Sequence, residues 1–288
     1  MRPFKQVDVF TPEPYRGNPV AVVLDGQGLT EAQMQDFTDW TNLSEATFLL
    51  PPTQPGADYR LRIFCPGREL PFAGHPTLGS CHAWLEAGGR PKGEFIVQEC
   101  GVGLVKLRRD AGSGRLAFAA PPLRKGGPLP EEDVALIARG LGVAREDIVG
   151  HAWCDNGPNW RGVLLKSAQQ VLALKPDAAI LEGLDVGVVG PRGKVGVVGS
   201  HDAGEDCAFE VRAFLPGNNG MIEDPVTGSL NAALAQWLIG AGLAPRQYVA
   251  AQGTVLRRAG RVHVQAADDG EIWIGGASVT CIDGQVRF

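Results

Sequence analysis

The chain has 288 residues, a formal net charge of −5 at pH 7, 44% hydrophobic residues and 20% charged residues. These values are ordinary for a soluble globular protein, and the length allows two domains. The weak negative charge, without a basic run, argues against a nucleic-acid or anionic-surface partner. No signal peptide is visible and no apolar stretch approaches about 18 residues, so we expect a cytoplasmic protein without a membrane segment.

Several common chemical motifs are absent from the sequence. The six cysteines have no CxxC spacing, which favours free thiols over a disulfide framework. The five histidines form no HExxH or similar pair, so we expect no metal site. Residues 101–103 lack the third glycine of a dinucleotide fingerprint, residues 190–195 lack the spacing of a phosphate loop, and no GxSxG elbow occurs. The sequence therefore offers none of the commonest nucleotide, metal or serine-hydrolase sites.

The first part of the chain reads as strands with an early helix. Thr30 followed by Gln33 is a capping-box pattern, and it predicts that a helix begins there. Short runs of alternating or apolar residues between turn signals predict strands. These strands are expected at 6–10, 20–24, 46–50, 94–98, 102–108 and 115–119.

The second part begins after a stretch rich in proline, glycine and cations at 121–130, which we interpret as a link between lobes. A helix is expected at 131–139, and a glycine-broken strand at 187–199. A buried strand at 161–166 and a meander after Gly242 complete the prediction. The meander's expected strands are 254–258, 261–265, 271–274 and 278–282.

One stretch occurs twice in the sequence. Residues 59–85 match residues 209–234, with Arg62 opposite Arg212 and Phe64 opposite Phe214, and with Gly79-Ser80 opposite Gly228-Ser229 after a one-residue gap. A self-match at about half the chain length indicates duplication. We therefore predict an α+β fold of two pseudo-symmetric lobes, each a mostly antiparallel sheet wrapped around a central helix. The expected boundaries are 1–120 and 121–288, and the last strand may return to the first lobe.

Each repeat is expected to end in a buried helix that begins at an X-Pro pair. Pro76 and Pro225 suit the first helical position, and the helices that follow are apolar nearly all round. Helix N-termini bind carboxylates through unpaired N–H groups and partial positive charge. Two related lobes would bring both N-termini to the cleft between them. A carboxylate ligand is therefore expected near backbone N–H groups of residues 74–77 or 227–229.

Several residues at these helix starts have both a structural and a functional interpretation. Asp224 would make a good N-cap, whereas His75 is a poor one, which suggests another role for the histidine. Gly79 and Gly228 would cost helix stability unless a backbone or ligand approaches closely. Ser229 could donate a hydrogen bond to a ligand or simply pack.

The sequence resembles the phenazine-biosynthesis PhzF-like family, which has the diaminopimelate-epimerase-like fold. The matching pieces follow the family's order over nearly the whole chain. They are VDVFT (7–11), GNPVAVV (17–23), NLSEATF (42–48), AGHPTLGS (73–80), EDPVTGS (223–229) and GGA (275–277). The resemblance implies a two-lobed α+β fold, a homodimer, and cofactor-free isomerisation of trans-2,3-dihydro-3-hydroxyanthranilate.

The resemblance also implies the residues of the site. Glu45, which by spacing alone reads as an exposed loop acid, takes the place of the family's catalytic acid/base. The family's assisting residues correspond to His75, Asp224 and Ser229. The residues that line the site or bind substrate correspond to Ser44, Gly74, Thr77, Thr227 and Gly228. Related epimerases place cysteines at the two helix starts. Here these places hold Gly74-His75 and Asp224-Pro225, which argues against a two-thiol mechanism.

We therefore expect an isomerase that moves a proton on a small cyclic or unsaturated carboxylic acid. Glu45 would take the proton from carbon and return it elsewhere, in a cleft whose desolvation brings its pKa nearer neutrality. Two alternatives stay open. One is an epimerase or racemase that uses Glu45 and a second acid, and the other is a non-catalytic acid-binding protein.

Overall fold

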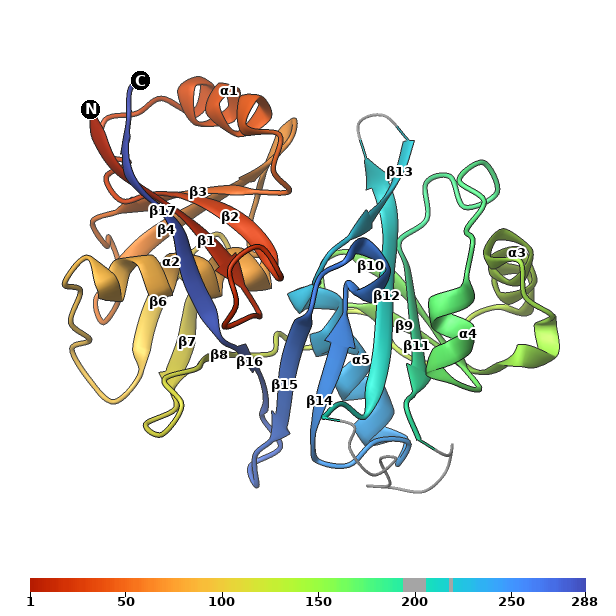
Figure 1. The fold of residues 1–288 in the computed structure, drawn as a ribbon. Helices are drawn as coiled ribbons and strands as arrows, with labels where there is room; N and C mark the ends of the chain where they lie inside the picture. The colour runs from red at the N-terminus through yellow and green to blue at the C-terminus, as the bar shows by residue number, and fades with distance from the viewer. Residues whose placement is uncertain (194–205, 218–219) are drawn as a thin grey trace. The chain divides into compact units, whose positions relative to one another are not determined.

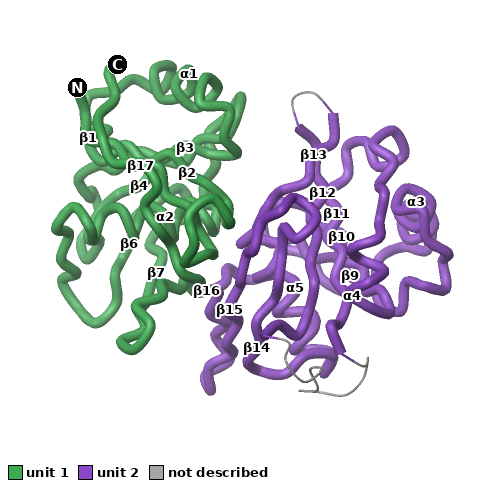
Figure 2. Tube along the Cα trace, viewed as in Figure 1, with its two compact units in different colours: residues 1–119, 275–288 green, residues 120–274 purple. Residues whose placement is uncertain are grey.

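The computed structural model describes residues 1–193, 206–217 and 220–288. The chain forms two compact units, unit 1 from Met1–Ala119 with Gly275–Phe288 and unit 2 from Ala120–Ile274 (Figure 2). The C-terminal segment therefore belongs to the same unit as the N-terminus. Within the described ranges, no helix is both long enough and apolar enough to cross a membrane.

Unit 1 is a sheet that surrounds one buried helix (Figure 1). The strands pair in the order β17–β1–β2–β3–β4–β6–β7–β8, with β5 added to β4 as a hairpin. The pairs β2–β3 and β4–β6 are parallel, and the others are antiparallel. The strands are β1 (Arg2–Val9), β2 (Asn18–Val23), β3 (Ala46–Leu50), β4 (Tyr59–Cys65), β5 (Arg68–Leu70), β6 (Ile96–Cys100), β7 (Gly103–Arg109), β8 (Leu116–Ala119) and β17 (Ser278–Val286).

The two helices of unit 1 differ in burial. Helix α1 (Glu31–Thr41) begins with the capping box of Thr30 and Gln33, as predicted, and lies at the outside of the unit. Helix α2 (Gly74–Glu86) is buried over its first two turns and packs against β1, β2, β8 and β17. At Gly79 a side chain would meet Val20 Cγ1 at 2.4 Å and Val9 Cγ2 at 2.9 Å. Close packing on the sheet, rather than a ligand, thus requires this glycine.

Unit 2 repeats this order of pairing. Strands pair in the order β9–β10–β11–β12–β14–β15, with β13 added to β12 as a hairpin. The pairs β10–β11 and β12–β14 are parallel, as are their counterparts in unit 1. The strands are β9 (Ile148–Asp155), β10 (Asn159–Leu165), β11 (Val186–Pro191), β12 (Phe209–Gly217), β13 (Gly220–Asp224), β14 (Gln247–Gln252), β15 (Gly260–Ala266) and β16 (Ile272–Gly276), which crosses the unit boundary.

The helices of unit 2 are α3 (Glu131–Leu141), α4 (Ala168–Ala173) and α5 (Gly228–Gly240). Helix α5 is the counterpart of α2, since each follows the short hairpin strand and each has 13 residues. The core of unit 2 is apolar and includes Trp153, Val163, Val188 and Phe214. Strand β9 and helix α4 were not predicted from the sequence.

The structure corrects the expected helix starts. Pro76 is the third residue of α2, whose N-cap is Ala73, and α5 begins at Gly228 with Thr227 as N-cap. Asp224 is the last residue of β13, so its interpretation as an N-cap is wrong. Pro76 lies within the first turn, where N–H groups have no intrahelical acceptor and proline is tolerated. Pro225 lies outside its helix, two residues before the N-cap Thr227, so neither proline marks the first helical residue.

The alignment of the two repeats also needs correction. Gly74 and Gly228 start helices of equal length and lie 154 positions apart, whereas Arg62 and Arg212 lie 150 apart. The hairpin is longer in unit 2: β12 ends five residues after Arg212 and β13 has five residues, whereas β4 ends three residues after Arg62 and β5 has three. Two extra residues on each strand account for the change of four in the offset. The helix starts therefore match Gly74-His75 with Gly228-Ser229.

Two further strand predictions are affected. Residues 254–256 form a short 3-10 turn instead of a strand, and the strand at this point is β14, which comes before Gly253. Gly253 has a φ of 89°, in the left-handed region that glycine adopts readily, and it ends the strand. Of the expected strand at 187–199, residues 194–199 lie outside the described residues.

Candidate functional site

Glu45 is held between the end of a helix and the start of a buried strand. Asn42 caps α1 with a φ of 56°, a left-handed conformation that asparagine tolerates. Strand β3 follows directly, and its residues Ala46 and Phe48 are fully buried. The Ala21 N–H donates to the backbone carbonyl of Glu45 at 3.4 Å. The glutamate backbone is therefore fixed, while its side chain remains 15% exposed.

His75 lies next to this carboxyl. It is the second residue of α2 and is 4% exposed. Its Nε2 lies 3.3 Å from Glu45 Oε2, and both atoms are buried. Its Nδ1 lies 3.4 Å from the Asn18 side-chain amide. The first turn of the buried helix thus places an imidazole against the predicted acid/base.

The imidazole of His75 is neutral at physiological pH. Burial lowers its pKa to about 3, and a hydrogen bond to the Pro19 backbone opposes this only in part. The contact with Glu45 is therefore between a carboxyl and a neutral ring, despite a distance that would suit an ion pair. A neutral ring does not neutralise the charge of a carboxylate beside it.

Ser44, Gly74 and Thr77 complete the predicted set in unit 1. Gly74 is buried as the first residue of α2, and Ser44 is half-buried beside Glu45. Thr77 is fully buried and already hydrogen-bonded, since its N–H donates to Ala73 and its hydroxyl accepts from Gln98. The backbone N–H groups of Gly74 and His75, which have no intrahelical acceptor, suit an anion better than that of Thr77.

In unit 2, Asp224 belongs to a hydrogen-bonded cluster with Thr227 and Gln252. The Thr227 hydroxyl donates to Asp224 Oδ2 at 2.6 Å. Gln252, which is 1% exposed at the end of β14, donates to the Asp224 carbonyl and to the Thr227 hydroxyl. Its amide oxygen accepts from the Thr227 N–H. The sequence reasoning missed Gln252, because its role depends on pairing between β12 and β14.

The hydroxyl of Ser229 accepts a hydrogen bond from a buried tryptophan. Ser229 is the second residue of α5, as His75 is of α2. The buried Trp160 donates its indole N–H to Ser229 Oγ at 3.2 Å, and Asn156 donates to the Ser229 carbonyl at 2.9 Å. An indole N–H can only donate, so the serine hydroxyl hydrogen points to a different partner. Ser229 is therefore suited to donate to a ligand.

Asp185 is the counterpart of Glu45 in unit 2, which the sequence repeat did not reveal. Asp185 immediately precedes β11, as Glu45 precedes β3. The segments between the matching strands differ in length, so only the strand register exposes the match. The pairs that establish it are Ala46 with Phe64 and Val186 with Phe214.

Thiol chemistry is disfavoured at the helix starts. Cys81 lies in the second half of α2, is fully buried, and has its pKa raised to about 12 by burial. Burial raises the pKa of the Cys154 thiol to about 12 as well. All six cysteines are free. A thiol with such a pKa is almost entirely protonated near neutral pH and makes a poor base.

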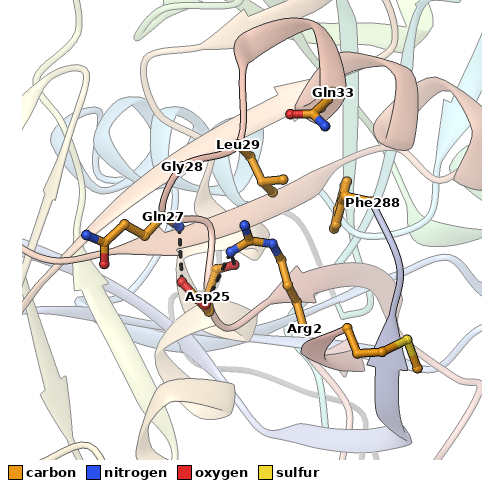
Figure 3. Close-up of a pocket in the computed structure, with 8 residues that line it drawn as sticks. Arg2, Asp25, Gln27, Gly28, Leu29, Gln33 and Phe288 are labelled. Carbon is orange, nitrogen blue, oxygen red and sulfur yellow. Dashed lines mark hydrogen bonds and ion pairs between the residues drawn. The ribbon is translucent and has the colours of Figure 1, made fainter.

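A surface hollow of about 500 Å³ lies in unit 1 away from these residues (Figure 3). Arg2 and Asp25 on its wall are paired with each other, by a hydrogen bond of 2.7 Å and an ion pair of 3.2 Å. None of the predicted site residues lines it. In the parts of the chain that the structure describes, no cluster of three His, Cys, Asp or Glu side chains could hold a metal ion.

The model of the family described as phenazine biosynthesis-like protein matches residues 7–284. The chain belongs to this family. "Antisense-enhancing sequence 1" of Schizosaccharomyces pombe is 37% identical over 98% of this chain and 97% of its own. The trans-2,3-dihydro-3-hydroxyanthranilate isomerase of Pseudomonas aeruginosa is 32% identical over 94% of this chain and 92% of its own. The structure of a predicted epimerase from Pseudomonas aeruginosa is 28% identical with a TM-score of 0.79, covering 100% of both chains.

The family assignment gives the broad class of the protein. Several of its relatives are named isomerases or epimerases, and the chain is an enzyme of the isomerase class. The fold is a mixed α/β fold with few helices, like those of the structures of phenazine biosynthesis proteins.

Proposed function

We propose that the enzyme isomerises a small cyclic or unsaturated carboxylic acid by moving one proton, with Glu45 as the acid/base. The observation that carries the proposal is the 3.3 Å contact between the buried oxygen of Glu45 and the neutral imidazole of His75. A partly desolvated carboxylate is a stronger base than one in water. The name of the Pseudomonas relative supports a substrate like trans-2,3-dihydro-3-hydroxyanthranilate.

The proposed reaction keeps its atoms within one substrate molecule. Glu45 takes a proton from a carbon, and the electron pair of that C–H bond moves into the unsaturated system. The protonated Glu45 then returns the proton to a different carbon, which restores the carboxylate of the enzyme. The net change is a shifted double bond, so no external oxidant, reductant or cofactor is consumed.

The other site residues would bind and orient the substrate. The N–H groups at the starts of α2 and α5 can donate to its carboxylate, because they lie at the positive ends of buried helices. Ser229 can donate a hydrogen bond and Asp224 can accept one. We propose that the two related units, which we infer to be a duplication, act on the same substrate.

Exchange with solvent tests the proton transfer. In D2O, the wild-type enzyme should convert trans-2,3-dihydro-3-hydroxyanthranilate and incorporate deuterium at the carbon that receives the proton, as followed by NMR. Glu45→Gln keeps the shape of the side chain but cannot accept the proton, so turnover should fall about 10²–10⁴-fold while binding of 3-hydroxyanthranilate survives.

Three outcomes would contradict the proposal. Near-wild-type turnover by Glu45→Gln removes Glu45 from the role of base. Inversion of a stereocentre without a shifted double bond would favour an epimerase. Binding of cyclic acids without any C–H exchange would favour a non-catalytic acid-binding protein.

The family resemblance also supports a homodimer. We expect light scattering on the purified protein to give about twice the 30.5 kDa mass of one chain. A mass of one chain at micromolar concentration would reject this part of the proposal.

A further inference from the structure

The side-chain amide of Gln252 makes four hydrogen bonds, which is all that an amide can make. Its oxygen accepts from the Thr227 N–H at 3.0 Å and from the Asn231 side chain at 2.8 Å. Its nitrogen donates to the Thr227 hydroxyl at 2.9 Å and to the Asp224 carbonyl at 3.1 Å. Because the Thr227 N–H can only donate, the amide oxygen must face it, and the orientation of Gln252 is fixed.

This orientation sets the direction of the hydrogen bonds that follow. The amide nitrogen can only donate, so the Thr227 hydroxyl accepts from it and gives its own hydrogen to Asp224 Oδ2, 2.6 Å away. That oxygen is therefore an acceptor. The chain Gln252–Thr227–Asp224 holds the carboxyl group as a hydrogen-bond acceptor.

Unit 1 also has a buried glutamine that bonds its central helix, but it lacks this chain. Gln98, in the middle of β6, donates to the hydroxyl of Thr77, the fourth residue of α2. Asn231 is the fourth residue of α5 and also bonds a buried glutamine, but here the helix residue donates to the oxygen of Gln252. The N-cap of α2, however, is Ala73, which has no hydroxyl. Both units therefore have a glutamine bonded to the fourth residue of the central helix, but only in unit 2 does the chain extend to a carboxylate.

We propose that Gln252 is a positioning residue that acts through Thr227 to hold Asp224 as the acceptor for an N–H or O–H group of the substrate. This inference rests on the proposed function, in which Asp224 contacts the substrate. It predicts that Gln252 and Asp224 act as one unit in catalysis, whereas Gln98 and Asp224 act independently.

A double-mutant cycle tests this coupling with trans-2,3-dihydro-3-hydroxyanthranilate as substrate. Gln252→Leu alone should lower kcat/KM by about ten-fold or more, because Thr227 is no longer forced to donate to Asp224. In the Asp224→Asn background, the same change should cost less than about two-fold. Gln98→Leu is the matched control, and its effect should be the same in both backgrounds. Equal losses from Gln252→Leu in both backgrounds would overturn the proposal.

A second pair of variants covers the possibility that Gln252→Leu fails to fold. Thr227→Ser keeps the hydroxyl and should retain kcat/KM within about two-fold, whereas Thr227→Val removes it and should lose about ten-fold. Equal activity in the two variants would overturn the proposal. If the wild type turns over no cyclic acid, the proposed function fails and the positioning role fails with it. If the wild type turns over the substrate but Gln252→Leu lowers kcat/KM equally with and without Asp224→Asn, only the positioning role is rejected.

Discussion

His75 shows how burial converts an ionisable side chain into a fixed neutral group. Its pKa is about 3 in the folded protein, against 6.5 for the free side chain, because burial disfavours the charged ring. In the unfolded chain the imidazole binds a proton below about pH 6.5, and in the folded chain it does not. Protonation of this imidazole therefore favours the unfolded chain, and the folded protein becomes less stable as the pH falls.

The first residue-scale prediction concerns this linkage. Between about pH 6.5 and about pH 3, His75 should lower the free energy of unfolding by about 1.4 kcal/mol for each unit of pH decrease, and above about pH 7.5 it should have no pH-dependent effect. His75→Gln removes this dependence. The difference in unfolding free energy between the two proteins, measured by urea titration at several pH values, should change with this slope. A difference that stays constant over the window would contradict the neutral, buried imidazole.

At the scale of elements, each unit has an arginine that joins a strand of the sheet to the hairpin strand that follows it. Arg212 on β12 makes a two-pronged bond to Glu223 on β13, with distances of 2.9 and 2.7 Å, and also donates to the carbonyls of Val171 and Leu174. Arg62 on β4 makes the same two-pronged bond to Glu69. The sequence repeat that matched the two arginines therefore corresponds to a repeated contact between a strand and its hairpin.

The two arginine contacts should differ in strength because they differ in burial. Arg212 is 4% exposed, whereas Arg62 is 19% exposed and its partner Glu69 36%. Arg212→Lys should lower the unfolding free energy by about 3 kcal/mol, since lysine cannot serve the carboxylate and both carbonyls at once. Arg62→Lys should cost less than about 1 kcal/mol. Urea unfolding of both variants measures the difference, and equal costs would show that burial does not decide the strength of the contact.

The sequence predicted elements well where local patterns decide them. The capping box at Thr30 and the strand at 46–50 are found as predicted, because side-chain bonding and burial act within a few residues. The helix starts at Gly74 and Gly228 were misplaced, because an X-Pro pair can lie within the first turn, as in α2, or before the N-cap, as in α5. Gln252 and Asp185 were missed, because their roles depend on strand pairing between distant segments, which no local pattern encodes.

For the whole molecule, the proposal joins one candidate cluster from each unit. Unit 1 supplies a carboxyl beside a neutral imidazole, and unit 2 supplies a hydroxyl donor and a carboxyl acceptor. If both clusters act on one substrate, as proposed, the effects on kcat/KM of substitutions in the two units should depend on each other.

The last prediction tests this interdependence through Glu45 and Asp224. If both act on one substrate in one step, Glu45→Gln removes the proton transfer that Asp224 assists, and the double variant Glu45→Gln/Asp224→Asn should be little less active than Glu45→Gln alone. If the units act separately, the losses in kcat/KM should multiply. Asp224→Asn alone should cost less than Glu45→Gln, because orientation is shared with Ser229 and the helix N–H groups, whereas proton transfer is not. Asp224→Asn as damaging as Glu45→Gln would instead favour an enzyme with two acids.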